Sequence, residues 1–161
     1  MRILLTIAGG GFFWQSKAVA RGLVDGFELH YATVEPAKVW IGSGLPQGTF
    51  HEISGITTQM KKGWLSRILR FCASARDTFF AVRQARPDAI VCIASSVAIP
   101  LLLWGRLLGK RTVFIESITR VSKASTTGKI VDCLGLCDRF YVQWPEAVAL
   151  YRKAVYRGTV L

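Results

Sequence analysis

Short apolar runs alternate with stretches of helical spacing along almost the whole chain. The first run, Arg2 to Ala8, ends at three glycines, and apolar residues then recur at helical spacing from Trp14 to Leu23. A strand, a glycine turn and a helix in this order are typical of a β-α unit. The same alternation predicts strands at 27–34, 49–53, 88–94, 111–116 and 139–144, and helices at 61–86, 100–109 and 127–137.

Strands that alternate with helices favour a doubly wound sheet. We therefore predict the α/β class, with a single Rossmann-like domain over residues 1–161 and a mostly parallel sheet. The uncharged span from Ala89 to Gly105 is divided by Pro100, so a strand followed by a helix is favoured over a membrane span. The first apolar run has no small-residue cleavage site, which favours a strand over a signal peptide.

The net charge of +11 narrows the choice of partners. Such an excess of Lys and Arg is typical of proteins that meet nucleic acid, an anionic membrane or a phosphate-bearing substrate, and the charge alone does not choose among them. The cysteines lie in apolar contexts without a CxxC pair, far in sequence from both histidines, which favours buried reduced thiols in the cytosol over a zinc site. They are Cys72, Cys92, Cys133 and Cys137.

Ligands of doubly wound proteins bind beyond the carboxyl ends of the strands, where helix N-termini gather. Glycines and polar residues of this chain follow several of the predicted strands, and we expect them to share one rim. They are Gly9, Gly10 and Gly11, then Ser95 and Ser96, then Glu116 and Ser117, and finally Gln143.

Two known phosphate motifs fail at these loops. The GxGxxG pattern would need glycine at Trp14, and a P-loop that ends at Gly128 and Lys129 would need glycine at Lys123 and Ser or Thr at Ile130. What remains at residues 125–129, STTGK, is a predicted helix start with Ser125 or Thr126 as its N-cap.

Two charged residues near this rim could take part in catalysis or in substrate binding. Glu116 is a carboxylate that could accept a proton from a sugar hydroxyl, and the alternative is a helix cap or an ion pair with Arg120. Lys129, near a helix N-terminus, could contact the phosphate of a lipid-linked acceptor.

The stretch from Lys61 to Arg86 places cations between apolar residues at helical spacing, which predicts a basic amphipathic helix. We predict membrane contact by this helix; the alternative is an ordinary helix packed on the sheet. The residues that we expect to meet the membrane are Trp64, Arg67, Arg70 and Arg76.

Five segments together resemble one known family. The segments GGGFFWQ, PLLLWGRLLGKRTVFIES, SKASTTGK, DRFYVQWPE and YRGTVL have the order and approximate spacing seen in PssD-like bacterial polysaccharide-biosynthesis proteins, homologues of asparagine-linked-glycosylation protein fourteen. The resemblance covers nearly all of the chain. It implies the N-terminal, acceptor-binding half of a GT-B glycosyltransferase, in which a separate small subunit binds the UDP-sugar.

The resemblance implies that the chain is inactive alone, and we expect no cofactor or metal. It implies peripheral association with the cytoplasmic face of the bacterial inner membrane and sugar transfer to a polyprenyl-diphosphate-linked glycan in exopolysaccharide or capsule biosynthesis. Relatives commonly have His where Phe12 stands and Thr-Gly where Ser95 and Ser96 stand, and we expect these three residues to contact the acceptor as well. The family's cleft maps onto Gly9, Gly10, Gly11, Glu116, Ser117, Thr127, Gly128, Lys129, Gln143, Trp144 and Pro145.

A basic α/β domain that binds nucleic acid is the alternative function. It is disfavoured because the cations concentrate in an amphipathic helix, without aromatic residues interleaved among them on a sheet face. We therefore expect no nucleic-acid partner.

Overall fold

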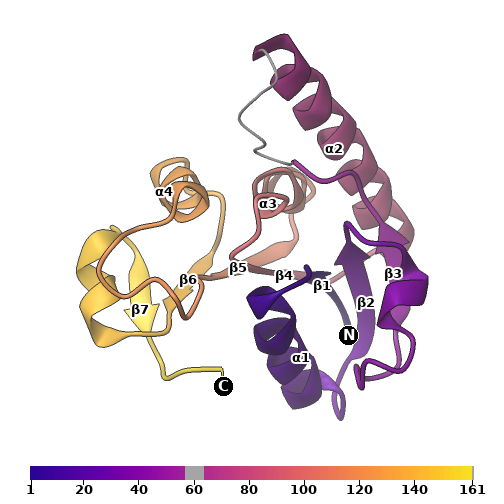
Figure 1. Cartoon of the computed structure of the whole chain (residues 1–161), viewed down its shortest axis with the longest axis horizontal. Coiled ribbons are helices and arrows are strands. Elements are labelled where there is room, and N and C mark those ends of the chain that lie inside the picture. Colours follow the sequence, from indigo (N-terminus) through magenta and orange to yellow (C-terminus); the bar gives the residue numbers. More distant parts are fainter. Residues whose placement is uncertain (57–63, 161) are drawn as a thin grey trace.

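The computed structural model describes residues 1–56 and 64–160. These residues form a seven-stranded sheet in the order β3-β2-β1-β4-β5-β6-β7, and every neighbouring pair is parallel (Figure 1). The strands are β1 (Arg2–Ile7), β2 (Glu28–Thr33), β3 (Thr49–Glu52), β4 (Ala89–Ile93), β5 (Arg111–Ile115), β6 (Arg139–Val142) and β7 (Ala154–Tyr156). The helices are α1 (Gly11–Leu23), α2 (Trp64–Ala85), α3 (Ala98–Leu107) and α4 (Thr126–Cys133), with short 3-10 helices η1 (Ala37–Trp40) and η2 (Pro145–Leu150).

The α/β class and the parallel sheet are confirmed. The uncharged span divides into β4 and α3, as predicted. Helix α4 ends earlier than predicted, because Gly135 turns the chain with a φ of 59°. Strand β7 was not predicted, since it is a short edge strand with two of its three residues exposed.

Helices cover both faces of the sheet. Helix α1 packs on one face of β1 and β4, while α2, α3 and α4 lie on the other face (Figure 1). Strands covered on both faces are apolar throughout, and all five residues of β4 are buried.

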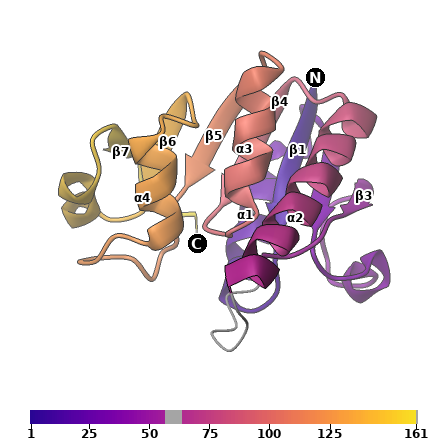
Figure 2. The same ribbon diagram turned by 90° about the horizontal axis from the view of Figure 1, so that it is seen from above.

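The strand order places a switch point between β1 and β4. From β1 the chain builds β2 and β3 on one side, and it then crosses back to add β4 and the later strands on the other. Figure 2 shows that the strands end on the same side of the molecule. In open parallel sheets, the crevice between the loops that follow the two strands at the switch point is where ligands bind.

The thiols only partly match the expectation. Cys92 is buried and Cys137 is half-buried, but Cys72 and Cys133 are exposed, so the prediction of buried thiols is wrong for these two. Cys72 lies in α2, and Cys133 is the last residue of α4. Burial raises the pKa of Cys137 to about 11.

The two histidines, distant in sequence, meet across β2 and β3. Nδ1 of His30 lies 3.1 Å from Nε2 of His51, and Nε2 of His30 lies 3.1 Å from Oε1 of Glu28. Burial and the neighbouring His30 lower the pKa of His51. The folded protein therefore disfavours protonated His51 more than the unfolded chain does.

We expect this pair to make stability depend on pH. Because the pKa of His51 is lower in the folded state, its contribution is complete above the unfolded value of about 6.5 and is lost as the pH falls from that value through the lower folded one. Urea midpoints at pH 7.5 and 5.5 measure the loss, and His51→Gln should reduce it. Equal pH slopes for the parent and the variant would contradict the expectation.

Candidate functional site

A cavity of about 450 Å³ lies at the switch point. The loops after β1, β2, β3 and β4 form it, and it includes four of the residues predicted for the site: Gly9, Phe12, Ser95 and Ser96. The other lining residues are Ala8, Val34, Glu35, Gly55, Ile56, Ala94 and Val97.

The glycine turn brings backbone to the cavity. Gly10 has a φ of 69° and a ψ of −144°, a conformation that side chains other than glycine rarely adopt. The Gly9 N–H donates to Oε1 of Glu35 at 3.2 Å, and a Cβ on Gly9 would lie 2.9 Å from the same oxygen. The turn therefore depends on glycine at Gly10, whereas a side chain at Gly9 would displace the Glu35 carboxylate.

The loop after β4 is strained at the same place. Ala94 has a φ of 42°, in the left-handed region, which costs about 1–3 kcal/mol for a residue other than glycine. Its N–H donates to the carbonyl of Ile115 at 3.0 Å, so the β5 strand holds the strained turn. Such strain is concentrated at binding and catalytic sites.

Helices α1 and α3 begin at this cavity. Neither has a side-chain hydrogen bond at its N-cap in the described chain, and neither has an acidic residue in its first turn. In α3 the N–H groups of Ala98 and Ile99 donate to the carbonyls of Ser95 and Ser96, and Pro100 has no N–H, so α3 contributes only the positive end of its dipole. At α1, where Phe13 donates to the Gly10 carbonyl, the N–H groups of Gly11 and Phe12 are suited to an anionic group such as a phosphate.

The carboxylate of Glu116 lies away from this cavity and has no exposed surface. Its Oε2 accepts hydrogen bonds from the Ser125 hydroxyl at 2.6 Å and from the Tyr151 hydroxyl, and its Oε1 accepts from the Ser117 N–H at 2.8 Å. Ser125 in turn caps α4 by accepting from the Gly128 N–H at 2.8 Å, which confirms Ser125 as the N-cap.

These contacts favour the capping alternative for Glu116. Both carboxylate oxygens are occupied, and the described residues form no ion pair between Glu116 and Arg120. Burial and the bond to Glu116 raise the pKa of Tyr151, so its hydroxyl keeps the proton that it donates. The base role predicted for Glu116 stays a prediction, and the geometry points to a structural role.

Two buried glutamines join the glycine turn to the loops after β5 and β6. Gln143 Nε2 donates to Gln15 Oε1 at 2.7 Å and to the Glu116 carbonyl at 2.9 Å. Gln15 also accepts from the Ile118 N–H at 3.0 Å and donates to the Gly11 carbonyl at 3.3 Å. This network holds the two halves of the rim in fixed relation.

The other predicted site residues lie outside the cavity lining. Thr127 and Lys129 stand in the first turn of α4, with the Lys129 side chain exposed, and Trp144 donates to the Ile118 carbonyl at 2.6 Å. Pro145 begins η2. The rim thus divides into a cavity at the switch point and a buried network beside it.

Sequence reasoning missed two kinds of residue. Glu35 follows β2 in a loop without a motif, and nothing in the sequence pointed to it. Gln15 had a usable signal: Val19 and Leu23 mark the core face of α1, and Gln15 lies on that face at helical spacing, while Trp14 is 60% exposed.

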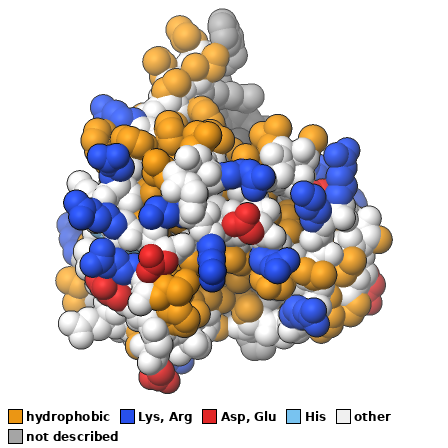
Figure 3. Space-filling model, turned by 180° about the vertical axis from the view of Figure 1, so that it is seen from behind, with side chains coloured by type: hydrophobic (Ala, Val, Ile, Leu, Met, Phe, Trp, Pro, Cys, Tyr) orange, Lys and Arg blue, Asp and Glu red, His pale blue; other side chains and the backbone are white. Residues whose placement is uncertain are grey.

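Helix α2 has two different halves. Near its carboxyl end, Ala81, Val82 and Ala85 are buried in the core. Its amino half projects from the body (Figures 1 and 3) and exposes Leu65, Ile68 and Leu69 at 59%, 45% and 62%. The carboxyl half therefore packs on the sheet as an ordinary helix does, and membrane contact by the amino half stays a prediction.

Of the residues predicted to meet the membrane, Arg70 is half-buried and Arg76 is exposed beside Asp77 at 3.2 Å. The side chains of Trp64 and Arg67 lie outside the described part of the chain, as do residues 61–63 of the predicted helix. Among the described residues, no helix has the length and apolar character needed to cross a bilayer, and no cluster of three or more His, Cys, Asp or Glu is arranged around a possible metal.

The fold has known counterparts. The chain aligns with MurG of Acinetobacter baumannii at a TM-score of 0.72 and 18% identity, covering 99% of this chain and 46% of MurG. A UDP-N-acetylglucosamine 2-epimerase from Rickettsia bellii aligns at 0.68 and 9% identity, covering 99% of this chain and 45% of the epimerase. The fold and its switch-point cavity define an α/β domain like the amino-terminal half of a GT-B glycosyltransferase.

Sequence comparison gives the family. Residues 49–160 match the family described as oligosaccharide biosynthesis protein Alg14 like, so the chain belongs to the Alg14-like family. It is 33% identical to the UDP-N-acetylglucosamine transferase subunit ALG14 of Rattus norvegicus over 109 residues, which are 64% of this chain and 50% of the relative. The human protein of the same name is 28% identical over 144 residues, 86% of this chain and 63% of the relative. The chain thus spans between half and two thirds of these relatives.

Proposed function

We propose that the chain is the acceptor-binding, membrane-associated subunit of a two-component glycosyltransferase. A partner subunit binds the UDP-sugar, and the acceptor is a polyprenyl-diphosphate-linked glycan of a bacterial exopolysaccharide or capsule pathway. The observation that carries the proposal is the switch-point cavity, with the N-termini of α1 and α3 at its edge, in a chain of the Alg14-like family.

The cavity suits the two ends of such an acceptor. The N-terminus of α1 offers the N–H groups of Gly11 and Phe12 for the diphosphate, α3 adds the positive end of its dipole, and Ser95 offers a hydroxyl. A sugar hydroxyl needs a base instead, and Glu35 is the carboxylate that lines the cavity. Its Oε1 accepts from Gly9, while among the described residues its Oε2 has only a long contact of 3.5 Å with the Thr33 hydroxyl.

Glu35 is therefore our candidate for the base, in place of Glu116. In the transfer, the acceptor oxygen bonds to the anomeric carbon of the donor sugar, the bond from that carbon to the UDP oxygen breaks, and Oε2 of Glu35 takes the hydroxyl proton. UDP leaves on the side of the partner subunit. Glu116 supports the rim from within through the cap of α4.

The sheet offers a surface for the partner. Helix α1 covers β1 and β4 on its face, whereas among the described residues the helices that contact β5, β6 and β7 are α3 and η2, which share the core on the opposite face. Val113 and Tyr141 lie there half-buried, Val155 is 41% exposed, and the exposed Arg111 and Arg139 add positive charges. A partly apolar surface with arginines at its edge suits a protein partner.

The test is reconstitution. The chain is purified alone and together with the small protein encoded by a neighbouring reading frame, and transfer from UDP-sugars to a polyprenyl-diphosphate acceptor is followed by mass spectrometry. We expect transfer by the pair and none by either protein alone. Robust turnover by the isolated chain would refute the two-component assignment.

The exposed amino half of α2 is our candidate for the membrane contact. Changing Leu65 and Leu69 to Ser should weaken binding to anionic vesicles about 30-fold, because each half-exposed leucine contributes about 1 kcal/mol when lipid covers it. Folding should be unaffected, since neither side chain packs in the core. Vesicle flotation at low salt measures the change.

Matched controls stand on the opposite edge of the sheet. Leu107 and Leu134 are 65% and 64% exposed at the ends of α3 and α4, and changing them to Ser should leave flotation unchanged. If the Leu65 and Leu69 variant floats as well as the parent protein, α2 is not the membrane contact. Arg70 and Arg76 each contribute about 1 kcal/mol near an anionic surface, so reversing both charges by substitution with Glu should also weaken flotation.

A further inference from the structure

The segment Ser54–Ile56, just after β3, forms one wall of the switch-point cavity. Gly55 and Ile56 line the cavity directly. The wall packs closely, because a Cβ on Gly55 would lie 2.6 Å from Cγ1 of Val34 on the neighbouring loop. Its position therefore affects the size of the cavity mouth.

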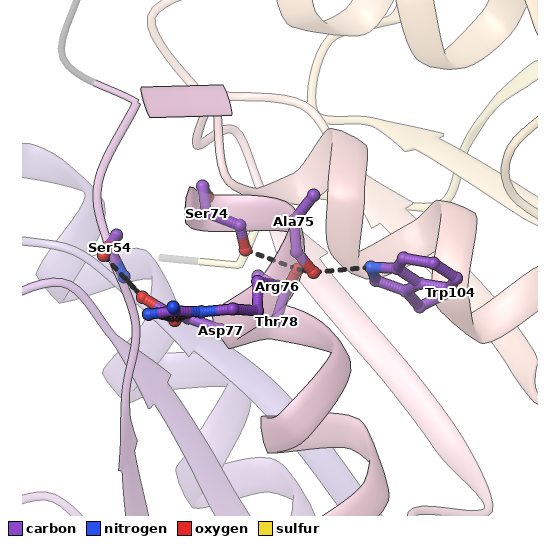
Figure 4. Close-up of polar contacts among 7 residues, drawn as sticks. All are labelled: Ser54, Ser74, Ala75, Arg76, Asp77, Thr78 and Trp104. Atoms are coloured by element: carbon purple, nitrogen blue, oxygen red, sulfur yellow. Dashed lines mark hydrogen bonds and ion pairs between the residues drawn. The ribbon is translucent and has the colours of Figure 1, made fainter. Parts of the chain in front are cut away.

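Asp77, in the middle of α2, holds this wall at its first residue. Oδ2 of Asp77 accepts from the Ser54 N–H at 3.2 Å and from the Ser54 hydroxyl at 2.5 Å (Figure 4). Oδ1 accepts from Nε of Arg76 at 3.2 Å. These hydrogen bonds, chiefly the one from the Ser54 hydroxyl, lower the pKa of Asp77, so the carboxylate is charged at neutral pH.

Helix α3 holds the other end of the wall. The Ser96 hydroxyl, in the loop that leads into α3, donates to the Ile56 carbonyl at 3.1 Å. Farther along α3, Nε1 of Trp104 donates to the Ala75 carbonyl of α2 at 2.7 Å (Figure 4). The contacts close a ring that runs from α2 through the wall to α3 and back to α2.

We propose that Asp77 is a positioning residue that fixes the Ser54–Ile56 wall to α2 and thereby sets the mouth of the cavity. Helix α2 then carries both the exposed amino half and Asp77, which connects the helix to the cavity wall through Ser54. The statement about the wall rests on geometry alone, while its effect on acceptor binding rests on the function proposed above.

Hydrogen exchange tests the wall directly. In Asp77→Asn, one acceptor oxygen becomes a donor, and we expect the amides of 54–56 to exchange about tenfold faster, which corresponds to one lost hydrogen bond to a charged group. Exchange in β1 and β4 should not change. Ser54→Ala should reproduce the effect, and Ser54→Thr, which keeps the hydroxyl, should not.

Asp88→Asn is the matched control. Asp88 also accepts from a backbone N–H, that of Arg2 at 2.8 Å, but at the opposite edge of the sheet. It should leave exchange at 54–56 unchanged. Equal exchange at the wall in Asp77→Asn and the parent protein would overturn the proposal.

Binding of farnesyl diphosphate, a short polyprenyl diphosphate, gives the second readout. We expect the affinity of Asp77→Asn to fall about tenfold, in proportion to the opening of the wall. If the parent protein does not bind this probe, the function proposed for the cavity fails while the exchange result still decides the role of Asp77. If the probe binds both proteins equally, Asp77 does not set the mouth of the cavity.

Discussion

Replacing Glu35 by glutamine should lower the kcat of the reconstituted pair by about 100-fold or more, the usual contribution of a general base. Glutamine keeps an oxygen that can accept from the Gly9 N–H, so the glycine turn and the cavity should keep their shape. The apparent KM for the acceptor should therefore change by no more than about twofold, because the lost interaction is made in the transition state.

The control for Glu35 is its neighbour Glu52. The Glu52 carboxylate also accepts from a backbone N–H, that of Ala37 at 2.9 Å, but lies outside the cavity lining. Glu52→Gln should keep full turnover. Acceptor-saturation kinetics and the pH dependence of kcat, measured on both variants, test whether Glu35 is the general base. Normal turnover by Glu35→Gln would show that it is not.

Glu116→Gln separates the two carboxylates further. This substitution should lower the melting temperature, because Glu116 is buried and accepts hydrogen bonds from Ser125, Tyr151 and Ser117. Activity should then recover on cooling. A large fall in kcat without a change in melting would restore Glu116 as the base.

The fold could be predicted from the sequence because its strands are covered on both faces. An apolar run such as Ala89–Ile93 stands out against the polar turns that flank it, and the alternation with helices leaves few topologies other than a doubly wound sheet. The edge strand β7 could not be predicted from the sequence, because only its first residue is buried.

The site could be predicted less well, because it depends on which loops meet. The sequence places Gly9 and Ser95 after strands, but only the strand order brings those two strands together at the switch point. Glu116 looked available because it follows a strand, yet the chain beyond it folds back and buries it beneath Ser125 and Tyr151. No local pattern reveals a contact between residues so far apart in sequence.

A mutation at Gly128 tests that buried network most severely. A Cβ at this position would lie 2.3 Å from Oε2 of Glu116, 2.7 Å from the Tyr151 hydroxyl and 3.0 Å from the Ser125 hydroxyl. These three groups bond to one another, so none can move aside without losing a hydrogen bond to a buried charge. We expect Gly128→Ala to destabilise the protein by about 3 kcal/mol, through overpacking and the loss of such a bond.

Thermal unfolding should show this as a fall in Tm of about 6–12 °C for a domain of this size. The same substitution at Gly22, in α1, is the control, because a Cβ there meets nothing within 4 Å. Gly22→Ala should raise stability by about 0.5–1 kcal/mol, since alanine loses less backbone freedom than glycine in a helix. If Gly→Ala lowers stability at position 128 and raises it at position 22, the loss at position 128 comes from the contacts around Gly128. If Gly128→Ala has the same Tm as the parent protein, α4 packs less tightly against Glu116 than these distances indicate, and Glu116 has room to move toward a ligand.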